Sequence, residues 1–122
     1  MANEFSITSS FKLSNGNDSF TRTVSFNADQ TAVGGPSPGV LSIGTSHEAV
    51  APTDLTNKGW ALFKNLDDTN FVEVGVDVAA TFYPLIKLLP GEQVQVRLSP
   101  SVSLYAKADT AAVRLDAQIF EA

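Results

Sequence analysis

The residues of this chain best suited to chemistry are an imidazole and the carboxylates near it. His47, the only histidine, is followed directly by Glu48 and lies close in sequence to Asp54. An imidazole beside carboxylates could bind a metal ion or act in acid–base catalysis. A metal site needs further ligands, however, and the chain has no second histidine and no cysteine. We therefore interpret this segment as a surface loop and predict no catalytic residue and no metal there.

A second group of oxygen-bearing side chains lies between two predicted strands. Its members are Asp67, Asp68, Asn70 and Glu73. Such oxygens are the usual ligands of calcium, but their spacing does not match the EF-hand loop. The order Asp-Asp-Thr-Asn is also typical of a turn in which an Asp side chain accepts hydrogen bonds from the backbone. We predict this turn, with no metal and no cofactor.

Composition narrows the classes of function further. The sequence contains no GxSxG, HExxH or P-loop pattern, and we expect the protein not to be an enzyme. A net charge of −5 argues against nucleic acid as a partner, because phosphate binding depends on clustered Lys and Arg. The absence of cysteine excludes disulfides and thiolate metal sites. The length of 122 residues predicts one domain.

The beginning of the chain lacks the features of a secretory signal. The segment MANEFSITSS has neither a basic region nor a continuous apolar region, and no apolar span in the chain is long enough to cross a bilayer as a helix. We expect synthesis in the cytoplasm and no membrane partner.

Period-two alternation predicts a hairpin near the N-terminus. Apolar and polar residues alternate over 5–13 and again over 20–26, which is typical of half-buried strands. Asn15 and Gly16 between them favour a tight turn with positive φ. Arg22 falls on the apolar side of the second strand. We expect it either at an exposed strand end or with its guanidinium paired to a carboxylate.

The segment DQTAVGGPSPG, residues 29–39, is the clearest loop in the sequence. Its glycines and prolines disfavour regular dihedral angles and remove backbone donors. We expect a flexible loop here and an N-terminal arm over residues 1–11. An unpaired extended arm can add a strand to the edge of a neighbouring sheet, so both segments are predicted to contact partners.

Six further strands are predicted after this loop, over residues 40–45, 60–66, 69–77, 81–89, 92–98 and 112–120. Pro84 indicates an edge strand or a bulge, because proline cannot donate to a ladder. Pro90-Gly91 is the signature of a type II turn and predicts a hairpin. About eight short strands with no helix predict an all-β fold, an antiparallel, jelly-roll-like β-sandwich formed as a single domain by residues 1–122.

Three aromatic residues have the amphipathic character favoured at wet binding surfaces, namely Trp60, Tyr83 and Tyr105. A carbohydrate-binding module would need them exposed for stacking on sugars. Packing in the core or in an interface is the more ordinary role of Trp60.

Most of the chain resembles a group of small structural proteins of tailed bacteriophages. The resemblance lies in the runs GWALFKNLDDTNFVEVGVD, FYPLIKLLPGEQVQVRLSP and LYAKADTAAVRLDAQIFE, and in the upstream VLSIGTSHEAV. It covers roughly residues 40–121 and does not extend to the predicted N-terminal hairpin. The resemblance implies a virion protein. The matched residues Asn65, Asp67, Asn70 and Gly91 have the character of turn-forming residues that fix a fold.

The expected function is that of a capsid decoration (cement) protein, which stabilises the phage head through many contacts. Its expected partners are the major capsid protein or other virion proteins, and further copies of itself, with a trimer favoured. A tail, connector or baseplate component and a carbohydrate-binding host-recognition module are the alternatives. The predicted interface residues are Phe5, Ile7, Phe11, Val33, Pro36, Pro38, Trp60, Tyr83 and Tyr105.

Overall fold

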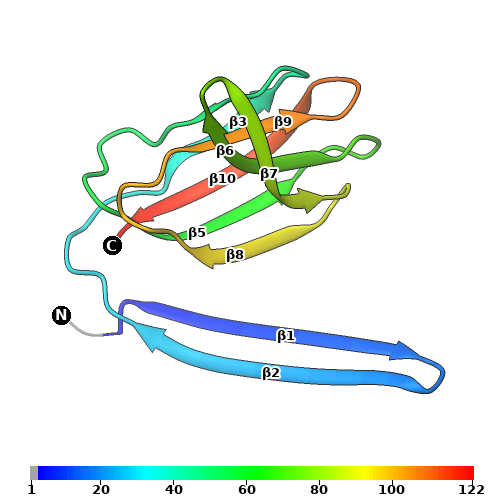
Figure 1. Ribbon diagram of the computed structural model, residues 1–122. Coiled ribbons are helices and arrows are strands. Elements are labelled where there is room, and N and C mark those ends of the chain that lie inside the picture. The colour runs from blue at the N-terminus through cyan, green and yellow to red at the C-terminus, as the bar shows by residue number, and fades with distance from the viewer. Residues whose placement is uncertain (1–2) are drawn as a thin grey trace. The chain divides into compact units, whose positions relative to one another are not determined.

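The computed structural model describes residues 3–122, which form two compact units, one ending at Ala32 and the other spanning 33–122. All regular structure in these residues is β, as predicted. The strands are β1 (Phe5–Asn15), β2 (Asp18–Ala28), β3 (Ser37–Ile43), β4 (Glu48–Val50), β5 (Lys58–Asn65), β6 (Val72–Val78), β7 (Thr81–Leu88), β8 (Gln93–Arg97), β9 (Leu104–Ala108) and β10 (Val113–Glu121) (Figure 1). No helix in the described residues is long and apolar enough to span a membrane.

The first unit is a long antiparallel hairpin of β1 and β2. Its register closes at Asn15 and Asp18, which leaves Gly16 and Asn17 as a two-residue loop. Gly16 has a φ of 59°, and Asn17 is not in the left-handed region. These angles indicate a type II′ turn, whose first central position favours glycine and whose twist matches that of the strands. The predicted hairpin and its turn are confirmed.

The predicted arm over residues 1–11 differs from the structure. Residues 5–11 pair along their whole length with residues 22–28, so they form half of a ladder and are not an unpaired strand. Residues 1–2 of the predicted arm lie outside the described residues. The sandwich predicted for the whole chain occupies the second unit.

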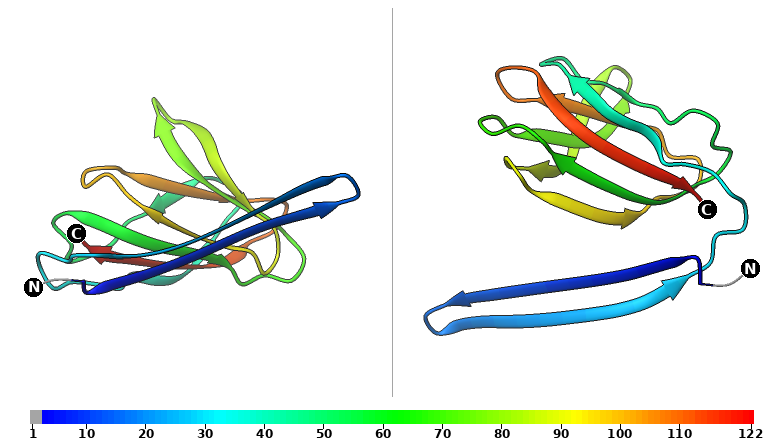
Figure 2. Two further views of the ribbon diagram at one scale, coloured as in Figure 1. Left: turned by 90° about the horizontal axis from the view of Figure 1, so that it is seen from below. Right: turned by 180° about the vertical axis from the view of Figure 1, so that it is seen from behind.

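The second unit is an antiparallel β-sandwich of two four-stranded sheets, as the two layers in Figure 2 show. One sheet has the order β3-β10-β5-β8 and the other β4-β9-β6-β7. Every second residue of β5 and β10 is buried, as half-buried strands require. The core between the sheets consists of Ile43, Val50, Ala61, Phe63, Val72, Val74, Leu88, Leu104, Ala106, Ala108, Val113, Leu115, Ala117 and Ile119.

The described residues form ten strands, whereas about eight were predicted. The two additional strands, β4 and β9, have no clear hydrophobic pattern in the sequence. β4 is three residues long and lies in a polar stretch. The inward residues of β9 are Leu104, Ala106 and Ala108, and two alanines carry little apolar signal. β3 begins at Ser37, inside the predicted loop 29–39. It tolerates Pro38 because it lies at the edge of its sheet.

The Pro90-Gly91 turn has the predicted type but a different role. Gly91 has a φ of 81°, and the amide of Glu92 donates to the carbonyl of Leu89 over 2.9 Å, which together define a type II turn. The strands on either side do not pair with each other. β7 pairs with β6 and β8 pairs with β5, so the turn carries the chain from one sheet to the other and does not close a hairpin.

A β-bulge at Gly75 confirms the prediction made from Pro84. Val74 pairs with Ile86 and Gly75 pairs with Pro84, which leaves Leu85 as the extra residue on β7, an edge strand. A Cβ added at Gly75 would lie 2.0 Å from the carbonyl oxygen of Tyr83. Val76, two residues after Val74, is only half-buried and is not part of the core.

We expect Gly75→Ala to destabilise the sandwich by about 2 kcal/mol or more, because the new methyl group would meet backbone atoms that cannot rotate away. Urea unfolding measures this change. Gly44→Ala is the matched control. Its Cβ would meet only the flexible carboxylate of Glu48, at 3.2 Å, and should cost less than about 1 kcal/mol. Equal stability of the two variants would contradict the bulge geometry.

Candidate functional site

One face of the hairpin is mainly apolar. The register places Phe11 beside Arg22 and Leu13 beside Phe20. Because successive side chains of a strand point to opposite faces, every second residue pair of the ladder lies on this same face. The large apolar side chains of this face are Phe5, Ile7, Phe11, Leu13, Phe20, Val24 and Phe26. Phe11 is the most open of them, with 65% of its surface exposed. We call this set the apolar hairpin face.

The opposite face of the hairpin is polar and carries one charged side chain. Serine and threonine form cross-strand pairs there, and the hydroxyls of Thr8 and Ser25 lie 3.1 Å apart. Ser10 and Thr23 form a second such pair at 3.2 Å. Lys12 and Thr21 pair closer to the turn. The two faces therefore differ sharply in their affinity for water.

Contacts with aromatic rings hold the side chains together in the half of the apolar hairpin face that lies near the turn. Phe11 and Phe20 meet edge to face, with ring centroids 6.0 Å apart and planes at 75°. The guanidinium of Arg22 lies over the Phe20 ring, 5.2 Å from its centroid. Both geometries are favourable for aromatic and cation–π contacts. Arg22 lies in the middle of β2, so of its two expected placements the exposed strand end is wrong, and its guanidinium lies over an aromatic ring.

The apolar hairpin face is the strongest candidate for a binding surface in the described chain. A two-stranded hairpin is marginally stable in water unless another layer covers its apolar side. The five most open members expose between 40% and 65% of their surface. The three phenylalanines among them then leave about 300 Å² exposed, and Leu13 and Val24 raise this to about 450 Å². Patches of this size are often functional on soluble proteins.

No protein-family model, curated protein or solved structure matches this chain. Function therefore has to be inferred from the surfaces of the two units.

The structure groups only some of the predicted interface residues. Phe5, Ile7 and Phe11 share the apolar hairpin face. Val33, at the start of the second unit, is 88% exposed, and Pro36 is exposed close to it. Leu13, Phe20, Val24 and Phe26 belong to the same face but were absent from the predicted set. The sequence contained the information needed to include them, because apolar and polar residues alternate in both strands and a tight turn joins the two strands.

The predicted aromatic residues of the sandwich do not form one platform. Trp60 lies on β5, while Tyr83 and Tyr105 belong to the other sheet. Trp60 and Tyr105 are half-buried, and Tyr83 is 51% exposed. A sugar ring could stack on Tyr83, but the three side chains do not converge on a single sugar-binding surface.

The imidazole of His47 lies beside the carboxylate of a residue that is distant in sequence. Its Nε2 lies 3.3 Å from Oδ1 of Asp77. The imidazole stacks on Phe82 at 5.5 Å and meets the ring of Tyr105 edge-on at 5.7 Å. Glu48, its neighbour in sequence, instead accepts a hydrogen bond from the amide of Gly44. These contacts attach the start of β4 to the sheet, and no group of three metal-ligating side chains occurs in residues 3–122.

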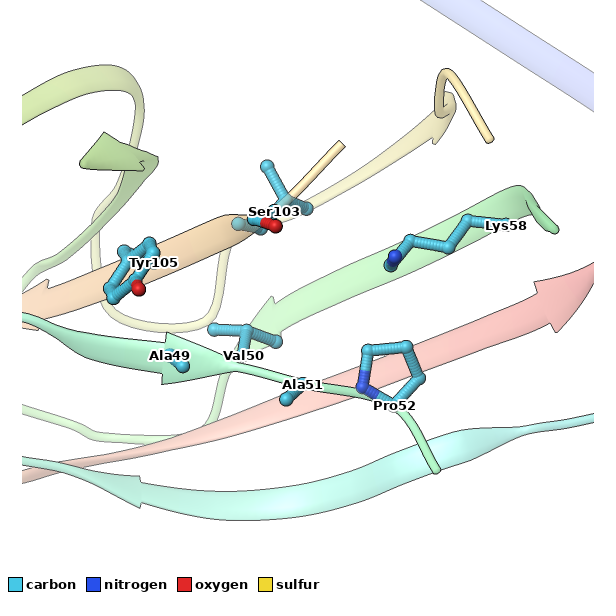
Figure 3. Close-up of a pocket in the computed structure, with 8 residues that line it drawn as sticks. Ala49, Val50, Ala51, Pro52, Lys58, Ser103 and Tyr105 are labelled. Carbon is cyan, nitrogen blue, oxygen red and sulfur yellow. The ribbon is translucent and has the colours of Figure 1, made fainter. Parts of the chain in front are cut away.

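Two pockets of the sandwich are small. One of about 160 Å³ lies between Ala49 and Pro52 on one side and Lys58 and Tyr105 on the other (Figure 3). Another, of about 180 Å³, is lined mainly by apolar side chains, including Val96 and Leu104. Sites for small molecules and cofactors typically occupy about 300–1,000 Å³. Each pocket is large enough for one side chain but not for a typical organic substrate.

Asp67, Asp68 and Asn70, three of the residues considered for calcium, lie in the predicted turn, while Glu73 lies on β6. The Asp67 carboxylate accepts hydrogen bonds from the amides of Thr69, at 3.0 Å, and Asn70, at 2.7 Å. The bonds from Asn70 and then Thr69 lower the pKa of Asp67, because they favour the charged carboxylate. The turn interpretation is confirmed.

Asn65 holds this turn against the neighbouring strands. Its fully buried side-chain amide donates to the carbonyls of Asn70, at 2.9 Å, and Leu88, at 3.0 Å. Its side-chain oxygen accepts from the amide of Asp67 at 2.8 Å. One side chain thus joins β5, β7 and the connection before β6, which fixes their relative positions.

We expect Asn65→Asp to lower the free energy of unfolding by about 3 kcal/mol, because a carboxylate cannot donate to the two buried carbonyls. Thermal and urea denaturation measure the change. Asn70→Asp is the matched control, since its exposed side-chain oxygen accepts from Thr110 and an Asp could still accept there. A loss in the control as large as in Asn65→Asp would show that Asn65 has no special role.

Glu121 secures the segment before β5 to the end of β10. Its side chain is only 6% exposed, and its two oxygens accept from the amides of Thr56, at 3.0 Å, and Asn57, at 2.6 Å. These bonds, the one from Thr56 foremost, lower the pKa of Glu121 below its usual value of 4.5, although burial opposes the shift.

The lowered pKa values of Glu121 and Asp67 predict acid sensitivity. A group whose pKa is depressed by folding contributes stability above its unfolded pKa, and the contribution disappears as pH falls through the folded pKa. We therefore expect the free energy of unfolding to fall as pH drops below about 4.5, the usual value for glutamate. Glu121→Gln should be less stable than the wild type at pH 7 and should lose less stability on acidification. An unchanged pH profile in this variant would contradict the account.

Proposed function

We propose that this chain is a bacteriophage virion structural protein that acts by docking through surface contacts and not by catalysis. The apolar hairpin face carries the proposal, because a surface of this kind has to be covered in the working state. The resemblance of residues 40–121 to phage structural proteins supports the virion setting. The small pockets of the sandwich fit the role of a rigid scaffold.

The strand order of the sandwich supports this class of protein. The sheets β3-β10-β5-β8 and β4-β9-β6-β7 are antiparallel and are joined by connections that cross between them. We propose that this arrangement is a jelly roll, an architecture common in viral capsid and lectin domains. Fold alone does not assign function, so the hairpin remains the deciding feature.

The most specific form of the proposal is a capsid decoration protein bound to the major capsid protein and to further copies of itself. Many weak contacts on a shell add up to strong attachment, because each bound copy raises the effective concentration of the next contact. The hairpin and the exposed segment around Val33 and Pro36 are the proposed contact elements. A tail, connector or baseplate position is the alternative within the virion.

A carbohydrate-binding module is a second candidate, favoured by the exposure of Tyr83. It predicts that glycans of the host surface bind the purified protein and that Tyr83→Ala abolishes the binding. Absence of binding across a glycan array would remove this candidate.

Electron cryo-microscopy of the virus that encodes this chain tests the decoration role. We expect density on the outside of the head that is lost when the gene is deleted and restored when the purified protein is added. Phe11→Glu should prevent this restoration, because it places a charge on the apolar hairpin face. Thr21→Glu, on the polar face beside Lys12, is the matched control and should bind normally.

Density confined to the tail would contradict decoration and support the alternative virion position. Absence of the protein from purified particles would contradict the virion proposal as a whole.

A further inference from the structure

We propose that the apolar hairpin face packs against the same face of a second copy, with the two hairpins antiparallel about a two-fold axis. This pairing rests on the hairpin and not on the virion role. It assigns the apolar hairpin face to the contact between copies, which leaves the exposed segment around Val33 and Pro36 as the proposed contact with the capsid. It yields a dimer, in place of the trimer expected from the sequence.

The exposed area suits a self-association of this kind. Two copies of the face bring together about 900 Å² of apolar surface, at about 450 Å² each. Asn15 and Asp18, next to the turn, and Arg22, in the middle of β2, lie on the same side of the ladder and would add polar area. The total then approaches the roughly 1,200 Å² at which specific protein interfaces begin. Two apolar sheet faces stack about 10 Å apart, the ordinary spacing of a β-sandwich.

Side-chain sizes along β1 match when two copies run antiparallel. An in-plane two-fold axis across the strands places β1 over β1 of the second copy and reverses its direction. With the axis at the level of Ser10 and Thr23, Phe11 faces Ser9 of the other copy. Phe11 is the most exposed large residue of the face, and Ser9 is the only small residue within the apolar part of β1. The arrangement thus places the exposed Phe11 ring of one copy over the small Ser9 side chain of the other.

The levels next to these are compatible with the same axis. Leu13 faces Ile7 of the second copy, and Phe20 faces Phe26, which gives an aliphatic pair and an aromatic pair. Arg22 faces Val24, so its aliphatic stem can pack while its guanidinium stays over Phe20. Because the axis is two-fold, each contact occurs twice.

Sedimentation velocity of the full chain over a range of concentrations tests the pairing. We expect the wild type to be a dimer that dissociates on dilution. Leu13→Lys and Ile7→Glu should each raise the dissociation constant at least tenfold, since each buries two unpaired charges per dimer. Thr21→Glu, on the polar face, is the control and should leave the dimer unchanged.

An equimolar mixture of Leu13→Lys and Ile7→Glu tests the antiparallel arrangement. The mixed dimer places the new Lys opposite the new Glu at one contact and keeps the native Leu13–Ile7 contact at the other. We therefore expect the mixture to dimerise more tightly than either variant alone. The mixed sample also shows that both variants are folded, because an unfolded variant could not restore the dimer.

Three results would overturn the proposal. A wild type that stays monomeric at every concentration would exclude self-association of the face. A dimer unaffected by both charged variants would place the interface elsewhere. Failure of the mixture to recover, or an oligomer other than a dimer, would exclude the antiparallel two-fold pairing. None of these results bears on whether the protein decorates a phage head, which microscopy decides separately.

Discussion

An apolar face of a β-sheet is stable in water only when a second layer covers it, and this constraint organises the whole chain. The sandwich satisfies it internally, because the inward residues of β5 and β10, such as Phe63 and Leu115, meet those of β6 and β9, such as Val74 and Ala106. The hairpin has a face of the same kind formed by only two strands. Its length of 11 residues in each strand makes that face large. The proposed docking function is based on the need to cover this face.

The polar interactions of the sandwich indicate a rigid support. Asn65 fixes the connection between β5 and β6 against β7, and Glu121 fixes the segment before β5. The bulge at Gly75 and Pro84 interrupts the regular ladder at the β7 edge, which protects it from pairing with other chains. These features fit the proposed role of a rigid module that makes its contacts through dedicated surfaces.

Local chemistry predicted the parts of the fold that depend on short segments. The all-β class, the turn at Gly16, the type II turn at Gly91 and the edge position of Pro84 each depend on a few adjacent residues, and each is present. Pairing between distant strands was not predictable in this way, so the type II turn was expected to close a hairpin although it joins two sheets. The apolar hairpin face was half predicted. Phe5, Ile7 and Phe11 were chosen from β1, and the residues of β2 on the same face were left out although their alternation was visible in the sequence. The contact between His47 and Asp77 depends on tertiary packing alone.

The most direct test of the central claim is amide hydrogen exchange of the full chain at high and low protein concentration. If the apolar hairpin face is an interaction surface that self-association covers, the amides of β1 and β2 will be protected at high concentration and will exchange quickly on dilution. Those of β5 and β10 should be equally protected in both samples, because their layer is covered within the sandwich. Protection of β1 and β2 that does not depend on concentration would contradict the account.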